Sequence, residues 1–175
     1  MSCRSALVFV ALMAIVVTAR ASAQNQSKAA SAERTLEVKL NYIGAGTVDQ
    51  THQIYVMVTD SDPFTSEVLA NVSDKPAGKN ETSAAGQTRK ICYILARQGA
   101  AAKDQVLTFS GITVSSIYVV AFYDKSGTND GQSEPASGSP TGLYGTKPGQ
   151  PDPVKIEQGR TVRIVVTFDD SSTVP

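Results

Sequence analysis

The amino-acid sequence predicts an all-β fold, an antiparallel β-sandwich of about seven to eight strands joined by Greek-key connections. Three observations predict it. Apolar residues alternate with polar ones in short stretches, as in strands that bury one face. Residues that favour turns, chiefly Gly, Pro, Asn, Asp and Ser, separate these stretches. No window keeps the apolar period of a helix, so we expect a single β domain.

The first 23 residues have the organisation of a secretory signal peptide. Arg4 supplies the positive charge, residues 6–17 form an apolar run of 12, and Ala21-Ser22-Ala23 provides small residues before a cut at Gln24. An apolar run of this length is too short for the roughly 30 Å of a bilayer core. We therefore expect a secreted or periplasmic protein with no membrane span after cleavage.

The mature chain divides into a flexible leader, 24–34, a β-sandwich domain, 35–170, and a C-terminal tail, 171–175. About 150 residues remain after cleavage, enough for one domain with its own core. The first strand, 35–42, alternates apolar and polar side chains. The second, 53–59, is apolar on both faces, which predicts that it is covered on both sides.

The remaining strands follow in order, with a weak strand at 67–72 and a long polar loop at 73–90. The stretch 116–123 is almost continuously apolar, which is typical of the centre of a packed sheet. A 29-residue stretch, 124–152, is dense in Gly, Pro, Ser and Asn and is expected to be a long loop. A shorter loop is expected at 98–103, and the other predicted strands are 91–96, 105–109, 154–156 and 161–168.

Charge argues against a nucleic-acid partner. The chain has 16 basic and 16 acidic residues, and loss of the signal with Arg4 and Arg20 leaves 14 and 16, a net charge of about −2. The longest basic cluster is the pair Arg89-Lys90, far from the basic patch that phosphate backbones need. The partner expected is an unknown protein or glycan at the cell exterior.

Few residues are available for catalysis. Cys3 leaves with the signal, so Cys92 is alone, cannot form an internal disulfide and is expected in the core. The only histidine, His52, excludes a zinc site built from several histidines and argues against a catalytic triad. Glu37 and Glu67 are the main acids on predicted strands, too few to indicate a hydrolase pair. We therefore expect no enzymatic activity and no bound cofactor, calcium excepted as described next.

The loop after the central strand carries the one pattern with metal chemistry. Oxygen-bearing side chains alternate along it, and calcium prefers six to eight oxygen ligands. The pattern differs from an EF-hand loop, with hydroxyls at the third and fifth positions and Asn129 where Gly is needed. A calcium site and a plain polar turn therefore remain alternatives; the candidate metal ligands are Asp124, Ser126, Thr128, Asp130 and Glu134.

Other side chains could serve recognition at the surface. Asn71 and Asn80 match the N-glycosylation pattern, which has meaning only in a eukaryotic source. Tyrosines could form a platform for sugars, although packing within the sheets is the more usual role; these are Tyr42, Tyr55, Tyr118, Tyr123 and Tyr144.

The same region resembles a known family. Phe122-Tyr123-Asp124 is followed by a Ser/Gly/Asn/Asp loop at 126–131 and by the segment 138–145, which reads Gly-Ser-Pro-Thr-Gly-Leu-Tyr-Gly; Phe109-Ser110-Gly111-Ile112 lies upstream. Residues 105–168 are thereby similar to an uncharacterised family of bacterial exported β-sandwich domains, prealbumin-like or carboxypeptidase-regulatory-like. The resemblance implies a prealbumin-like or carboxypeptidase-regulatory-like sandwich and no known activity, and the strand pattern itself is also compatible with an immunoglobulin-like sandwich. Thr128 replaces an Asn of the family's loop, which weakens a carry-over of metal binding.

These observations predict an exported, non-enzymatic binding or structural accessory module. Sandwiches usually carry function on their end loops, so the ligand is expected at 124–145. The alternatives are a calcium-stabilised adhesion or carbohydrate-binding module and a purely structural envelope protein. The candidate ligand residues are Asn129, Gly138, Pro140, Tyr144 and Gly145.

Overall fold

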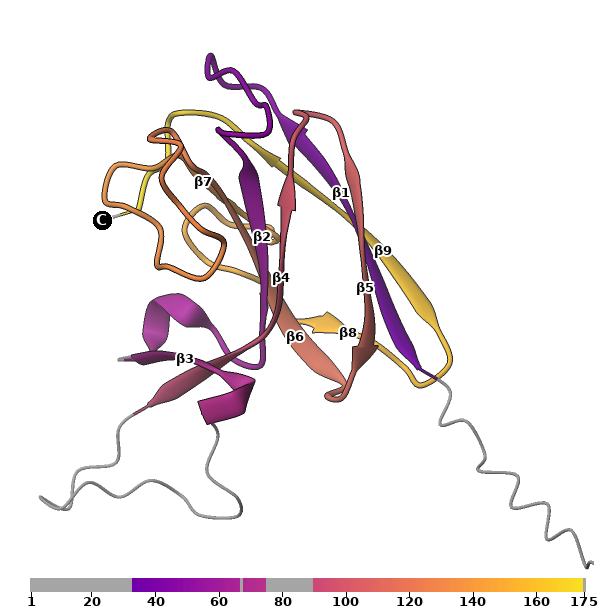
Figure 1. Cartoon of the computed structure of the whole chain (residues 1–175). Coiled ribbons are helices and arrows are strands. Elements are labelled where there is room, and N and C mark those ends of the chain that lie inside the picture. Colours follow the sequence, from indigo (N-terminus) through magenta and orange to yellow (C-terminus); the bar gives the residue numbers. More distant parts are fainter. Residues whose placement is uncertain (1–32, 67, 75–89, 175) are drawn as a thin grey trace, which may run out of the picture.

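The computed structural model describes residues 33–66, 68–74 and 90–174. The predicted signal peptide, nearly all of the leader, Glu67 and Asn80 lie outside the described residues. Among the residues it describes, no helix combines the length and the apolar character needed to cross a bilayer. Figure 1 shows strands as the dominant element.

The prediction of an all-β fold is confirmed. The first residue of each predicted strand lies within one residue of the first residue of an observed strand. Two short 3₁₀ turns, η1 (Pro63–Thr65) and η2 (Val72–Asp74), flank the third strand. The strands are β1 (Arg34–Tyr42), β2 (Ile54–Thr59), β3 (Val68–Asn71), β4 (Ile91–Ala100), β5 (Val106–Ile112), β6 (Ser116–Tyr123), β7 (Thr141–Leu143), β8 (Val154–Lys155) and β9 (Thr161–Phe168).

The strands form two sheets. One is three-stranded in the order β5-β1-β9, and the other is six-stranded in the order β3-β4-β2-β6-β7, with β8 pairing with β6. Both sheets are mixed, because β1 runs parallel to β9 and β3 runs parallel to β4. The expectation of purely antiparallel sheets is wrong for these two pairs. No hairpin joins either pair, and the chain between Asn71 and Ile91 is long enough for a parallel return.

Two expected loops contain strand. The stretch 124–152 includes β7, and the stretch 98–103 begins inside β4. A Cβ built at Gly142 would overlap the side chain of Phe168, so glycine is what lets β7 lie against β9. A three-residue strand with a central Gly has no readable alternation, which is why the sequence pattern misses it.

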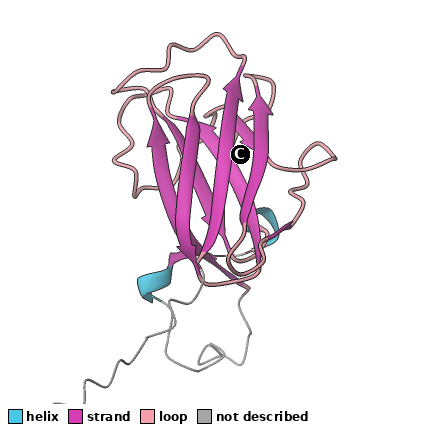
Figure 2. Ribbon diagram, turned by 90° about the vertical axis from the view of Figure 1, so that its right-hand side faces the viewer, coloured by secondary structure: helices cyan, strands magenta, loops and turns pink. Residues whose placement is uncertain are grey.

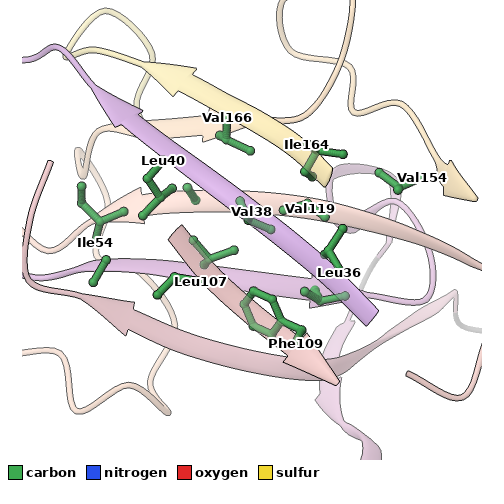
Figure 3. Close-up of a cluster of buried hydrophobic side chains, with 14 of the residues drawn as sticks. Leu36, Val38, Leu40, Ile54, Leu107, Phe109, Val119, Val154, Ile164 and Val166 are labelled. Carbon is green, nitrogen blue, oxygen red and sulfur yellow. The ribbon is translucent and has the colours of Figure 1, made fainter. Parts of the chain in front are cut away.

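Alternate side chains of both sheets meet in one hydrophobic core (Figure 3). Leu36, Val38 and Leu40 of β1 are fully buried. They share the core with Ile54 of β2 and Val119 of β6. The alternation read from residues 35–42 therefore identifies the buried face of β1. Cys92 is also fully buried, as expected, and its thiol donates to the carbonyl of Ser61 at 3.1 Å.

The larger sheet is also buried on its outer face along β2 and most of β6. All six residues of β2 are buried, which confirms that this strand is covered on both sides. Tyr55 and Met57 lie on the outer face, where the ring of Tyr55 stacks on Phe122 of β6 with centroids 5.5 Å apart. The loop that follows β6 returns over this face. Figure 2 shows the strands side by side, with loops at both ends.

An aromatic cluster closes one end of the core. The ring of Tyr42 lies 5.1 Å from that of Tyr123 and 4.9 Å from that of Phe168, centroid to centroid. The Tyr42 hydroxyl donates to Asp170, whose other oxygen accepts from the Ala45 amide at 2.8 Å. These contacts tie the β1–β2 loop and the chain after β9 to the same point.

We expect Gly142→Val to destabilise the fold, because the added side chain would overlap Phe168. Overpacking of this kind costs about 1–3 kcal/mol, measurable as a lower urea midpoint. Ser110→Val introduces the same side chain at an exposed position of β5; it is the control and should change stability little. Equal effects of the two variants would contradict close packing of β7 on β9.

We expect Tyr42→Phe to raise the pKa of Asp170. The pKa of Asp170 lies below its ordinary value of about 3.9. The main cause is the hydrogen bond from the Tyr42 hydroxyl, and the second is that from the Ala45 amide. A carboxyl group whose pKa is lower in the folded than in the unfolded protein stabilises the fold at pH values above the unfolded-state pKa. This stabilisation is lost as the pH falls through the folded-state pKa. Tyr42→Phe should therefore lose stability at neutral pH but show a flatter decline below about pH 4. Carboxyl NMR titration measures the pKa directly, and an unchanged value would contradict the contact.

Candidate functional site

The segment after β6 lines two hollows. The larger, here called the groove, has a volume of about 610 Å³ and lies between β7, residues 145–149, the end of β9 and residues 171–173. The smaller, here called the small cavity, has a volume of about 200 Å³ and lies under the 124–134 loop. No residue lines both. The region predicted to carry the ligand, 124–145, therefore lines most of the small cavity, whereas the groove takes only Thr141, Gly142, Leu143 and Gly145 from it.

The carboxylate of Asp124 organises the first half of the 124–134 loop. Asp124 is only 3% exposed, directly after β6. Its Oδ1 accepts from the amides of Ser126 and Gly127 and from the Ser126 hydroxyl, at 2.7–3.2 Å. Its Oδ2 accepts from the Asn129 amide at 2.7 Å. Gly127, with φ of +66°, allows the chain to wind around the carboxylate.

A second turn completes the loop. The Oδ1 of Asn129 accepts from the amide of Gly131 at 2.8 Å. The Oδ1 of Asp130 accepts from the amides of Gln132 and Ser133, each at 2.8 Å, and from the Ser133 hydroxyl at 2.9 Å. These donors, first the Ser133 amide, lower the pKa of Asp130 to about 2. The carboxylate of Asp130 is thus engaged by its own turn.

Arg97 of β4 holds this loop against the sheet. One guanidinium nitrogen donates to the carbonyls of Gly131 and Ser133, at 3.2 and 2.8 Å. The guanidinium carbon lies 5.9 Å from the ring centroid of Phe122. Burial lowers the pKa of Arg97, and nearby Asp130 opposes that effect. The sequence analysis missed Arg97, although a single cation inside an otherwise apolar strand is a signal for such a role.

The structure brings together four of the five predicted metal ligands. Asp124, Ser126, Thr128 and Glu134 line the small cavity, as does Asn129 from the predicted ligand residues, whereas Asp130 does not. Within the described ranges, no group of three or more His, Cys, Asp or Glu residues is arranged to hold a metal ion. Any ion here would depend on two carboxylates and on hydroxyl oxygens.

The other predicted ligand residues divide between the groove and the backbone. Gly145 lines the groove. Gly138, with φ of +79°, donates its amide to Val174. The carbonyl of Pro140 accepts from Tyr123, and the amide of Tyr144 donates to Val119. The Gly-x-Pro-x-x-x-Tyr-Gly pattern therefore forms β7 and positions the segment that surrounds the hollows.

The C-terminal residues form part of the groove. Residues 172–174 pair with residues 138–141, through amides of Thr141 and Gly138 that donate to Ser172 and Val174. The predicted tail 171–175 is therefore attached to the domain over most of its length. Hydroxyl-bearing residues line much of the groove, together with the charged Lys147 and Asp169.

Other candidate residues lie elsewhere. His52 is in the turn before β2, 3.2 Å from Asp49 at the surface. Glu37 forms an ion pair with Arg163 at 2.6 Å on the exposed face of the smaller sheet. Three of the five tyrosines proposed as a sugar platform are buried. These three, Tyr42, Tyr55 and Tyr123, pack against other aromatic rings.

We expect Asp124→Ala to loosen the 124–134 loop, because it removes four accepted hydrogen bonds at a buried position. Leaving such donors unpaired costs about 1–3 kcal/mol each where they stay buried. Faster hydrogen exchange of the Asn129 and Gly127 amides, with a lower melting temperature, is the readout. Asp130→Asn keeps an acceptor and serves as the control; unchanged exchange in Asp124→Ala would contradict this role.

Comparisons with known proteins identify no relative. No family model, no curated protein and no solved structure matches the chain.

Proposed function

We propose that this protein is an exported, non-enzymatic binding module whose ligand, a protein or a glycan at the cell exterior, occupies the groove. The observation that carries this proposal is the groove itself, formed at the segment 141–149 together with the C-terminal residues. Its volume of about 610 Å³ falls within the roughly 300–1,000 Å³ of small-ligand sites.

The composition of the groove suits a polar ligand with some apolar surface. Lining residues such as Thr146 and Thr173 carry hydroxyls, and Leu143 and Phe64 are apolar. Phe64 and Ile43, which both line the groove, are 46% and 64% exposed and so remain free to contact a ligand. Such a mixture of hydroxyls and apolar side chains is typical of sites that orient a ligand through a few polar contacts.

The fold we propose for this module is a Greek-key sandwich of the immunoglobulin-like or prealbumin-like kind. Two sheets that share one core support it, as does a chain that passes repeatedly from one sheet to the other. The sequence resemblance over 105–168 agrees with this fold. The signal-like residues 1–23 support export to the periplasm or the cell exterior.

We expect Thr146→Trp to abolish ligand binding, because an exposed residue that lines the groove would then fill it. The wild-type protein is first applied to a glycan array and to a library of displayed peptides. Thr108→Trp, the same exchange at an exposed position of β5, is the matched control and should keep binding.

Three results would count against the proposal. Binding that both variants retain would exclude the groove. Hydrolytic turnover abolished by one Asp or Glu exchange would exclude a non-enzymatic role. No binding to either collection would favour the purely structural envelope protein.

A further inference from the structure

We propose that the groove takes an extended peptide, which lengthens the larger sheet by pairing its backbone with the outer edge of β7. This inference rests on the proposed function, because it names the class of ligand for the same groove. Two features carry it: the backbone groups that β7 directs away from its sheet, and a segment of this chain that already pairs with part of the same edge.

β7 lies at one edge of the larger sheet and pairs antiparallel with β6. In such a pair, alternate residues exchange backbone hydrogen bonds with the partner strand, and the residues between them direct their N–H and C=O groups the other way. The carbonyl of Pro140 accepts from β6, and the amide of Tyr144 donates to it. By this alternation Gly142 also pairs with β6. The backbone groups of Thr141 and Leu143 therefore point away from β6.

The C-terminal residues of the chain occupy the first part of this outer edge. The amide of Thr141 donates to the carbonyl of Ser172 at 2.8 Å, and Pro140 forms an antiparallel bridge with Thr173. An extended backbone therefore fits beside β7 on this side. The pairing goes no further than Thr141, since within the described part of the chain the backbone amide and carbonyl of Leu143 have no hydrogen-bond partner.

The groove lies along the part of the edge that the C-terminal residues leave open. Leu143 lines it, as do Ser172 and Thr173 at the point where that segment diverges from β7. An unpaired strand edge presents donors and acceptors at the spacing of another strand. A peptide supplies amides and carbonyls at that spacing, whereas a glycan supplies hydroxyls without it. The edge therefore favours a peptide over a glycan.

Apolar side chains beside the edge favour a peptide with apolar residues. Ile43 and Phe64 line the groove and are largely exposed, and Leu143 is half-buried. Side chains of an added strand alternate between the two faces of the sheet, so every second residue of the peptide can contact this surface. In strand addition, backbone hydrogen bonds give the affinity and pockets for alternate side chains give the specificity.

The first test probes the backbone of the peptide. Peptides that the wild-type protein selects from the displayed library are synthesised with single backbone amides methylated, and binding is measured by calorimetry. A methylated amide cannot donate, and only every second amide of an added strand faces β7. We expect methylation at one alternate set of positions to weaken binding at least tenfold, and methylation at the other set to be tolerated. Equal losses at both sets, or no loss at either, would overturn the proposal.

The second test probes the edge of β7. Leu143→Pro removes the amide that points away from β6, a change that an edge strand tolerates, and should weaken peptide binding at least tenfold. Leu143→Val keeps the amide and is the matched control, which should still bind. In the wild-type protein, hydrogen exchange of the Leu143 amide should slow when peptide is bound, a readout that does not require the proline variant to fold. Unchanged exchange, or equal binding by the two variants, would overturn the proposal.

The results also separate this inference from the proposed function. Glycan binding that Thr146→Trp abolishes, with no binding of peptides, would overturn strand addition and leave the groove as the binding site. Peptide binding that Thr146→Trp abolishes but that shows no alternation on methylation would do the same. Binding of neither peptides nor glycans would overturn both.

Discussion

The two-sided burial of β2 and β6 is the constraint on which the rest of the structure depends. A strand that is apolar on both faces needs cover on both, and the smaller sheet supplies cover for one face only. The other face is covered by the loop after β6, held there by Tyr55, whose hydroxyl donates to the Asn129 carbonyl at 2.9 Å, and by Arg97. The loop is therefore part of the packing. It cannot leave the sheet without exposing Phe122, which is almost fully buried.

A covering loop must satisfy its own polar groups, because it lies against apolar side chains. Short side-chain acceptors do this at successive turns, with Asp124 and Asn129 bonding nearby amides. The many Asp, Asn, Ser and Gly residues of this loop are thus explained by its folding, without any ligand.

The sequence predicts most strands and one face of the core, because alternation over Leu36, Val38 and Leu40 depends on local residues alone. The relative direction of neighbouring strands cannot be predicted from local residues in this way. The parallel pairing of β1 with β9 is decided by how the chain crosses between sheets, which no local pattern records. The same limit applies to the site: the spacing of Asp124 to Glu134 indicates the loop, whereas Arg97 and Ser139 join it only through the tertiary fold.

The pairing of β1 with β9 joins the first and the last strand of the described residues along eight register positions. The central strand of the smaller sheet therefore lacks one neighbour until residues 161–168 have been synthesised. Contacts between residues so distant in sequence make folding slow. We therefore expect the core of this domain to close late, only after the chain beyond residue 160 is available for pairing.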